Sequence, residues 1–103
     1  MLPEPIKARI VRKIKDIASP IRVILFGSYA YGSPKPGSDI DIVVILEKSV
    51  SKIRDSDMIS RALRDIRIPK DIIVATQEEY DFYRKEPGSV FRTVAEKGVT
   101  IYG

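Results

Sequence analysis

The chain contains no cysteine, no histidine and no tryptophan. Without cysteine it can form no disulfide, no thiolate metal site and no cysteine nucleophile. Without histidine it has no imidazole base, no Ser-His-Asp triad and no histidine metal ligand. Any metal ion must therefore be held by oxygen ligands, and these favour hard cations such as Mg²⁺.

Long apolar runs are missing as well. The longest, Ile42–Leu46, is far too short to span a bilayer. The first residues, Met1-Leu2-Pro3-Glu4-Pro5, lack the basic segment and apolar core of a signal peptide. These two absences predict a cytoplasmic protein that does not associate with membranes.

The length, composition and net charge of the chain indicate what kind of protein it is. The 103 residues predict a single domain over residues 1–103, and 44% hydrophobic with 31% charged residues is typical of a globular chain. Eighteen Lys and Arg against fourteen Asp and Glu give a net charge of +4, with no basic run. We therefore expect no direct binding of nucleic acid through charge alone.

The spacing of apolar residues and turn residues predicts an α/β or α+β fold, in which helices pack on a small mixed sheet. The predicted strands are residues 22–26, 40–46, 71–75 and 99–102. The predicted helices are residues 5–18, 51–66, a segment beginning at the capping box Thr76-Gln77-Glu78-Glu79, and a segment from Ser89 to Lys97 stopped by Gly98. The mostly apolar run 40–46 is typical of a central strand buried on both faces.

Two aspartates stand at the start of that central strand. Side chains alternate across a strand, so Asp39 and Asp41 should point to the same face. Two adjacent carboxylates repel each other, and a shared divalent cation would relieve this repulsion. Mg²⁺ or Mn²⁺ is the natural candidate, because oxygen ligands suit both ions. The alternative interpretation is an ordinary turn followed by a strand, since Ser38 and Asp39 are common turn residues.

A glycine and a serine end the preceding strand. Gly27 allows the backbone to approach a ligand closely, and we expect Ser28 to cap a single helical turn whose free N–H groups suit a phosphate. Asp71 opens the next predicted strand and could add a third carboxylate that polarises an attacking hydroxyl. Its alternative interpretation is a solvated residue at the strand edge. Together these parts suit metal-assisted phosphoryl or nucleotidyl transfer.

The pattern Gly27-Ser28, ten residues, then Asp39-x-Asp41 resembles the motif of the DNA polymerase β-like nucleotidyltransferases. The fuller strings Gly-Ser-Tyr-Ala-Tyr-Gly and Ser-Asp-Ile-Asp, together with the small size, resemble the minimal nucleotidyltransferase (MNT) subgroup. Many members of that subgroup are antitoxins encoded beside a HEPN-domain ribonuclease toxin.

The resemblance implies a polymerase β-like fold and a role for each motif residue. It implies that Asp39 and Asp41 bind two Mg²⁺ ions, that Asp71 joins the catalytic metal, and that Gly27 and Ser28 hold the β- and γ-phosphates of a nucleoside triphosphate. It also implies transfer of AMP from ATP to a tyrosine hydroxyl of a HEPN-type toxin, with which the chain would form a hetero-oligomer. A homo-oligomer is left open.

Two other functions remain open at this point. The same domain could neutralise a toxin by docking alone, without catalysis. The three carboxylates favour an enzyme, because a pure binding module has no need for clustered charge. Transfer to a small molecule or to RNA would need a further domain to hold the acceptor, and 103 residues leave no room for it. We therefore expect the acceptor surface to come from a partner protein.

Overall fold

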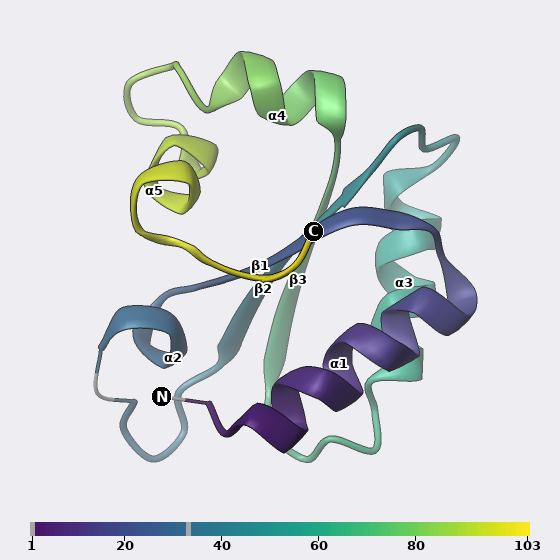
Figure 1. Ribbon diagram of the computed structural model, residues 1–103, viewed down its shortest axis with the longest axis vertical. Coiled ribbons are helices and arrows are strands. Elements are labelled where there is room, and N and C mark those ends of the chain that lie inside the picture. The colour runs from purple at the N-terminus through teal and green to yellow at the C-terminus, as the bar shows by residue number, and fades with distance from the viewer. Residues whose placement is uncertain (1, 33) are drawn as a thin grey trace.

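The computed structural model describes residues 2–32 and 34–103. Helices and strands alternate along most of this part of the chain (Figure 1). The elements, in chain order, are α1 (Glu4–Ile17), β1 (Pro20–Phe26), α2 (Ser28–Tyr31), β2 (Ile40–Leu46), α3 (Lys52–Ala62), β3 (Lys70–Thr76), α4 (Gln77–Tyr83), α5 (Val90–Lys97) and β4 (Val99–Tyr102). None of the helices in the described ranges combines the length and apolar character that crossing a bilayer requires.

The strands form one mixed sheet in the order β3-β2-β1-β4. β1 runs antiparallel to both of its neighbours, whereas β2 and β3 are parallel and are joined by the crossover helix α3. Parallel strands need such a crossover, since a tight turn can join only antiparallel ones. The predicted small mixed sheet with packed helices is confirmed.

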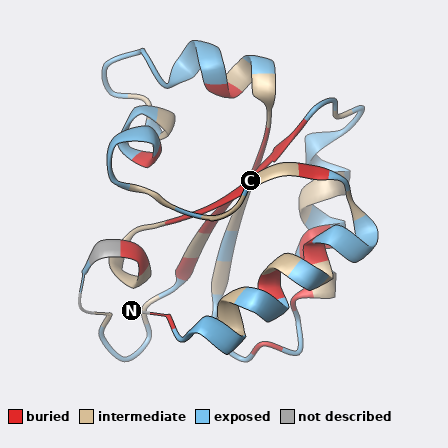
Figure 2. Ribbon diagram, in the orientation of Figure 1, coloured by how far each residue is buried: buried red, intermediate tan, exposed pale blue. Residues whose placement is uncertain are grey.

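Helices cover both faces of the sheet, as Figure 2 shows by the buried residues along the strands. One face packs against α1 and α3 and the other against α4 and α5. The alternation within β2 divides its side chains between these layers: Ile42 and Val44 belong to the first core, and Val43 and Ile45 to the second. β2 is thus the buried central strand that its apolar run predicts.

α3 ends earlier than its apolar spacing predicts. The spacing predicts a helix over residues 51–66, but α3 stops at Ala62 and turns follow. The Lys70 ammonium group donates to the Ile66 carbonyl at 2.5 Å and to the Ile68 carbonyl at 2.8 Å. These carbonyls are therefore satisfied by a side chain instead of by helical N–H groups. Leu63 and Ile66 remain buried, because the turns still direct them to the core.

The C-terminal elements begin and end where local chemistry predicts. Thr76 and Glu79 form a reciprocal capping box at the start of α4, and the Ser89 hydroxyl accepts from the Phe91 N–H at the start of α5. Gly98 ends α5, as predicted, at a close approach to β1. A Cβ on Gly98 would lie 2.6 Å from Cγ2 of Ile24, so the absence of a side chain lets β4 join the sheet.

Candidate active site

The residues singled out in the sequence meet at one end of the sheet. Because β1 and β2 are antiparallel, the last residue of β1 lies beside the first residues of β2, and Phe26 pairs with Asp41. β3 runs parallel to β2 on the other side, and Asp41 pairs directly with Asp71. This end of the sheet therefore brings together Gly27, Asp41 and Asp71, which are up to 44 positions apart in the chain (71 − 27).

Asp41 and Asp71 lie on the same face of the sheet. Residues paired in register on neighbouring strands project to the same side. That side is the face covered farther along by α4 and α5, because Val43 and Ile73, two positions on, belong to its core. Asp71 is thus on the strand next to Asp41 and on its face, as strand order predicts.

The carboxylates influence one another electrostatically. The pKa of Asp41 is raised above its ordinary value, first by burial, then by the charge of Asp71 and then by that of Asp39. Asp41 is half-buried, whereas Asp39 and Asp71 are exposed. Within residues 2–32 and 34–103, none of the three takes part in an ion pair. Oxygen donors that repel one another and lack a cationic partner fit a hard divalent cation.

The three carboxylates do not form a complete coordination group. In the part of the chain that the structure describes, no set of three acidic side chains is arranged to hold one metal ion. Asp41 and Asp71 are strand neighbours, and Asp39 stands one residue before β2 at the end of the preceding loop. The structure thus brings Asp41 and Asp71 directly together and places Asp39 close enough to affect the pKa of Asp41.

Gly27 lies against Asp41, and the absence of a side chain on Gly27 leaves room for the Asp41 carboxylate. Its φ of 75° is in the left-handed region that favours glycine. A Cβ there would collide with Oδ2 of Asp41 and lie 3.3 Å from Cγ of the same residue. Sequence reasoning missed this contact, since it assigned Gly27 only to ligand approach. The antiparallel register of β1 and β2 was the missing information, because it puts Phe26 opposite Asp41.

The prediction that Ser28 caps the helical turn is wrong by one residue. Gly27 is the N-cap of α2, Ser28 is its first helical residue, and no side-chain hydrogen bond caps the helix. The Gly27 carbonyl accepts from the Ala30 N–H at 3.0 Å. The chain has to reverse direction at the end of β1, and Gly27 provides the positive φ for that reversal, so the turn begins after it. The half-buried Ser28 still follows directly on the residue that touches Asp41.

Comparison with protein families identifies the class to which this site belongs. Residues 7–99 match the model of the nucleotidyltransferase domain, and this range contains β1, β2 and β3 and reaches the first residue of β4. The chain therefore belongs to the nucleotidyltransferase domain family. A search of curated proteins gives no match.

Solved structures show the same fold. A toxin–antitoxin structure with AMP-PNP superposes with a TM-score of 0.71 at 21% identity, covering 94% of this chain and 73% of that one. A candidate nucleotidyltransferase from Sulfolobus solfataricus gives 0.58 at 28% identity, covering 91% and 75%. A tri-AMPylated Shewanella oneidensis HEPN toxin in complex with MNT antitoxin gives 0.56 at 18% identity, covering 97% and 71%. The predicted resemblance to nucleotidyltransferases is confirmed by the family match, and these structures share the fold of this chain.

Proposed function

We propose that residues 1–103 act as a single Mg²⁺-dependent adenylyltransferase domain, which transfers AMP from ATP to a hydroxyl of a partner HEPN-type ribonuclease toxin and thereby acts as its antitoxin.

 The observation that supports this most directly is the pairing of Asp41 with Asp71, beside Gly27, in a chain of the nucleotidyltransferase domain family. Two carboxylates on one face, without a cationic partner among the described residues, are what a Mg²⁺ site for a triphosphate requires.

Each site residue has a role in this proposal. Asp39, Asp41 and Asp71 would hold Mg²⁺, with two ions as the family resemblance implies. The bound metal would neutralise charge on the phosphates during transfer. Gly27 leaves room for the Asp41 carboxylate, and Gly27 and Ser28 would hold the β- and γ-phosphates at the turn that begins α2.

The transfer step balances as a displacement at phosphorus. The acceptor oxygen forms a bond to the α-phosphorus of ATP, the bond from that phosphorus to the α–β bridging oxygen breaks, and pyrophosphate leaves. The acceptor proton passes to a carboxylate, for which we propose Asp71. This residue is exposed and lies beside Asp41, so a hydroxyl brought by a partner can reach it.

The choice of ATP and of a toxin hydroxyl draws on the structural neighbours. One neighbour is a toxin–antitoxin structure with AMP-PNP, and another contains a tri-AMPylated HEPN toxin together with an MNT antitoxin. These descriptions concern those proteins, and they support the same donor and the same kind of acceptor for this chain. Tyrosine is the acceptor that the resemblance implies.

The test is incubation of the purified chain with ATP labelled at the α-phosphate, Mg²⁺ and the HEPN-type toxin encoded beside it. We expect label on the toxin, and loss of about 100-fold or more in the rate for Asp41→Asn. Asp57→Asn is the matched control, because Asp57 is an exposed α3 carboxylate paired with Arg61. Equal labelling by Asp41→Asn and the unmodified chain would contradict the proposal.

Rescue of cells from the toxin separates catalysis from docking. The double variant Asp39→Ala with Asp41→Ala should bind the toxin but fail to neutralise it. If this variant neutralises the toxin as fully as the unmodified chain at equal concentration, the chain acts as a non-catalytic binding module and the adenylyltransferase proposal is wrong.

A further inference from the structure

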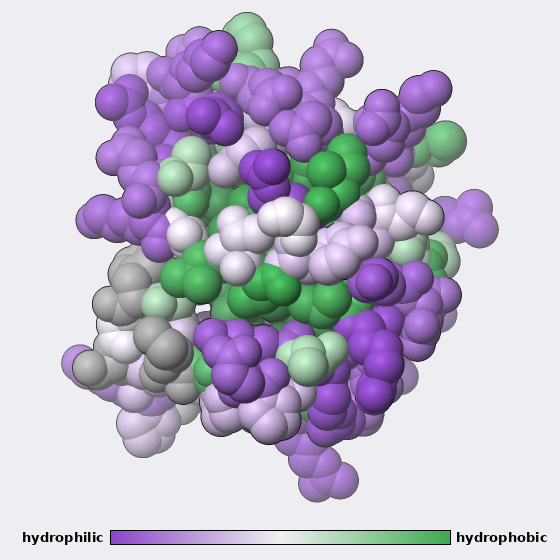
Figure 3. Space-filling view, viewed as in Figure 1, coloured by the Kyte–Doolittle hydropathy of each residue, from purple (hydrophilic) through white to green (hydrophobic). Residues whose placement is uncertain are grey.

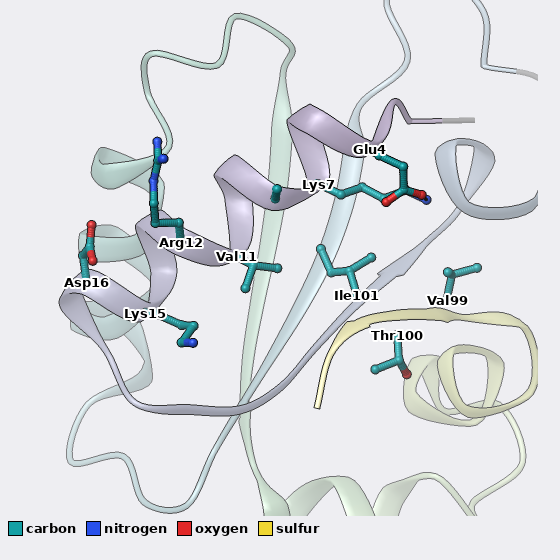
Figure 4. A pocket seen from close by; sticks show the side chains of 10 residues that line it. Glu4, Lys7, Val11, Arg12, Lys15, Asp16, Val99, Thr100 and Ile101 are labelled. Atoms are coloured by element: carbon teal, nitrogen blue, oxygen red, sulfur yellow. Dashed lines mark hydrogen bonds and ion pairs between the residues drawn. The ribbon is translucent and has the colours of Figure 1, made fainter.

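A groove runs between helix α1 and the edge strand β4, on the part of the surface drawn in Figure 4. Its volume is about 710 Å³. Its walls come from one side of α1 and from the first three residues of β4. None of Asp39, Asp41 and Asp71 lines it. The groove is therefore separate from the candidate active site.

The floor of the groove is apolar and includes the open edge of the sheet. Val11 of α1 and Val99 and Ile101 of β4 point into it (Figure 4). Figure 3 shows this apolar surface between the C-terminal strand and α1. β4 is the last strand in the sheet order, and its residues Val99–Tyr102 carry no charge and no proline. An uncharged edge strand without these protective features is a template for pairing with another strand.

The rim of the groove carries unpaired positive charge toward the C-terminal half of α1. In residues 2–32 and 34–103, Arg12 and Lys15 form no ion pair, and the Lys15 ammonium lies 4.8 Å from the centre of the Tyr102 ring. Asp16 is the one carboxylate lining that end. At the other end Lys7 pairs with Glu4. The groove therefore complements a segment that is apolar at its centre and acidic near Arg12.

One end of the groove lies at the same end of the sheet as Gly27. Val99 pairs with Leu25 of β1, and Leu25 stands two positions before Gly27. A strand lying along β4 would thus have one end near the turn at Gly27 that begins α2. The groove opens on the α1 face of the sheet, so a bound chain would pass around the end of the sheet to reach the acidic pair on the α4 and α5 face.

We propose that this groove binds an extended, acidic-apolar segment of the acceptor protein, which adds to β4 as a fifth strand of the sheet. The identity of the acceptor rests on the proposed function, whereas the groove itself does not. A second copy of this chain fits less well. The β4 strand of a second copy carries no charge, so it would offer no acidic group to Arg12 and Lys15.

The first experiment measures binding of the purified HEPN-type toxin in the absence of ATP and Mg²⁺. The double variant Arg12→Glu with Lys15→Glu should weaken binding by about tenfold or more, because it replaces attraction by repulsion. Arg64→Glu with Arg67→Glu is the matched control: it changes the charge equally at exposed positions after α3 and should change the Kd by no more than about twofold. If the two double variants bind the toxin with equal affinity, or if the unmodified chain does not bind it, the proposal that this groove binds the toxin is wrong.

A second experiment locates the bound segment by photo-crosslinking. A benzophenone side chain at Thr100, which is exposed on β4, should crosslink to one continuous segment of the toxin. The same group at Thr93, exposed on α5, should not do so. Crosslinks between copies of this chain at Thr100, with a dimer in sedimentation, would show that the second copy is the occupant and overturn the proposal.

The AMP-transfer assay separates failure of the groove from failure of the proposed function. If the groove guides the acceptor, Arg12→Glu with Lys15→Glu should raise the KM for toxin about tenfold and leave the KM for ATP unchanged. If this double variant transfers AMP with an unchanged KM for the toxin, the proposed role of the groove is wrong and the proposed function still stands. Toxin binding at Thr100 without any AMP transfer by the unmodified chain would contradict the proposed function alone.

Discussion

Carboxylates at two places in this molecule have opposite surroundings. In the turn that follows α3, Asp65 pairs with Arg9 at 2.6 Å and with Lys13 at 3.2 Å, and its pKa is lowered, chiefly by Lys13. At the start of β2, Asp41 faces Asp71 and Asp39, and its pKa is raised. The first arrangement fastens α1 to the end of α3. In the second, neighbouring carboxylates repel one another, which fits the proposal that this end of the sheet binds a cation.

The two places also differ in how the backbone supports them. Asp65 is exposed in a turn, and its partners reach it with long flexible side chains. Asp41 is half-buried within a strand and lies against Gly27. An ion pair that only stabilises the fold can form between flexible side chains, whereas the ligands of a metal or phosphate site must be held in fixed positions. The following predictions test this contrast.

The largest effect should come from Gly27→Ala. The new Cβ would collide with Oδ2 of Asp41, and the residue would be forced to keep a φ of 75°. We expect a loss of about 2–3 kcal/mol in unfolding free energy, measured by chemical denaturation, and loss of AMP transfer. Gly88→Ala is the control, because Gly88 has a φ of 83° but nothing within 4 Å of a Cβ. It should cost only about 1–2 kcal/mol and keep activity. If the two variants lost equal unfolding free energy and equal AMP transfer, the contact between Gly27 and the Asp41 carboxylate would not matter for either property.

Addition of Mg²⁺ should stabilise the unmodified chain through the acidic pair. At ten times the Kd, binding to the folded state alone adds about 1.4 kcal/mol, which thermal unfolding would detect. Asp41→Asn should lose most of this gain, and Asp65→Asn should keep it, because Asp65 lies in the ion pairs at the end of α3. A Mg²⁺ response that survives in Asp41→Asn would place the metal elsewhere.

Without metal, the same two substitutions should change stability in opposite directions. Asp41→Asn removes repulsion between directly opposed carboxylates and should raise the unfolding free energy by about 0.2–1 kcal/mol at pH 7. Asp65→Asn removes attraction to Arg9 and Lys13 and should lower it. Urea denaturation in EDTA measures both. A loss of stability in Asp41→Asn would instead indicate a structural aspartate.

The smallest effect should appear in the pH dependence of stability without metal. The pKa of Asp41 is raised in the folded state, so the folded chain loses stability as the pH rises from 3.8 through that higher pKa. The stability advantage of Asp41→Asn over the unmodified chain should therefore disappear as the pH falls below this window.

Glu79 behaves in the opposite way, because Lys52 and the Thr76 N–H lower its pKa. Its contribution is present above pH 4.5 and is lost as the pH falls through the lowered pKa. Denaturation curves of Glu79→Gln and Asp41→Asn across this range would separate the two cases.

Local features of the fold could be predicted where neighbouring residues decide them. The strand over residues 40–46, the capping box at Thr76 and the stop at Gly98 all agree with the structure. Two predictions about where a helix ends or begins were wrong. α3 ends at Ala62 and Lys70 binds the carbonyls of the turns that follow it, and α2 is capped by Gly27 instead of Ser28.

The sequence by itself determined the class of this protein, because the spacing from Gly27-Ser28 to Asp39-x-Asp41 depends only on positions along one segment. Only the tertiary structure decided that Asp71 stands directly beside Asp41, that Gly27 makes room for the Asp41 carboxylate, and that β4 is left as an open edge beside α1. The physical reason is strand register. Pairing between strands is set by the packing of both faces of the sheet at once, and that information is spread over the whole chain.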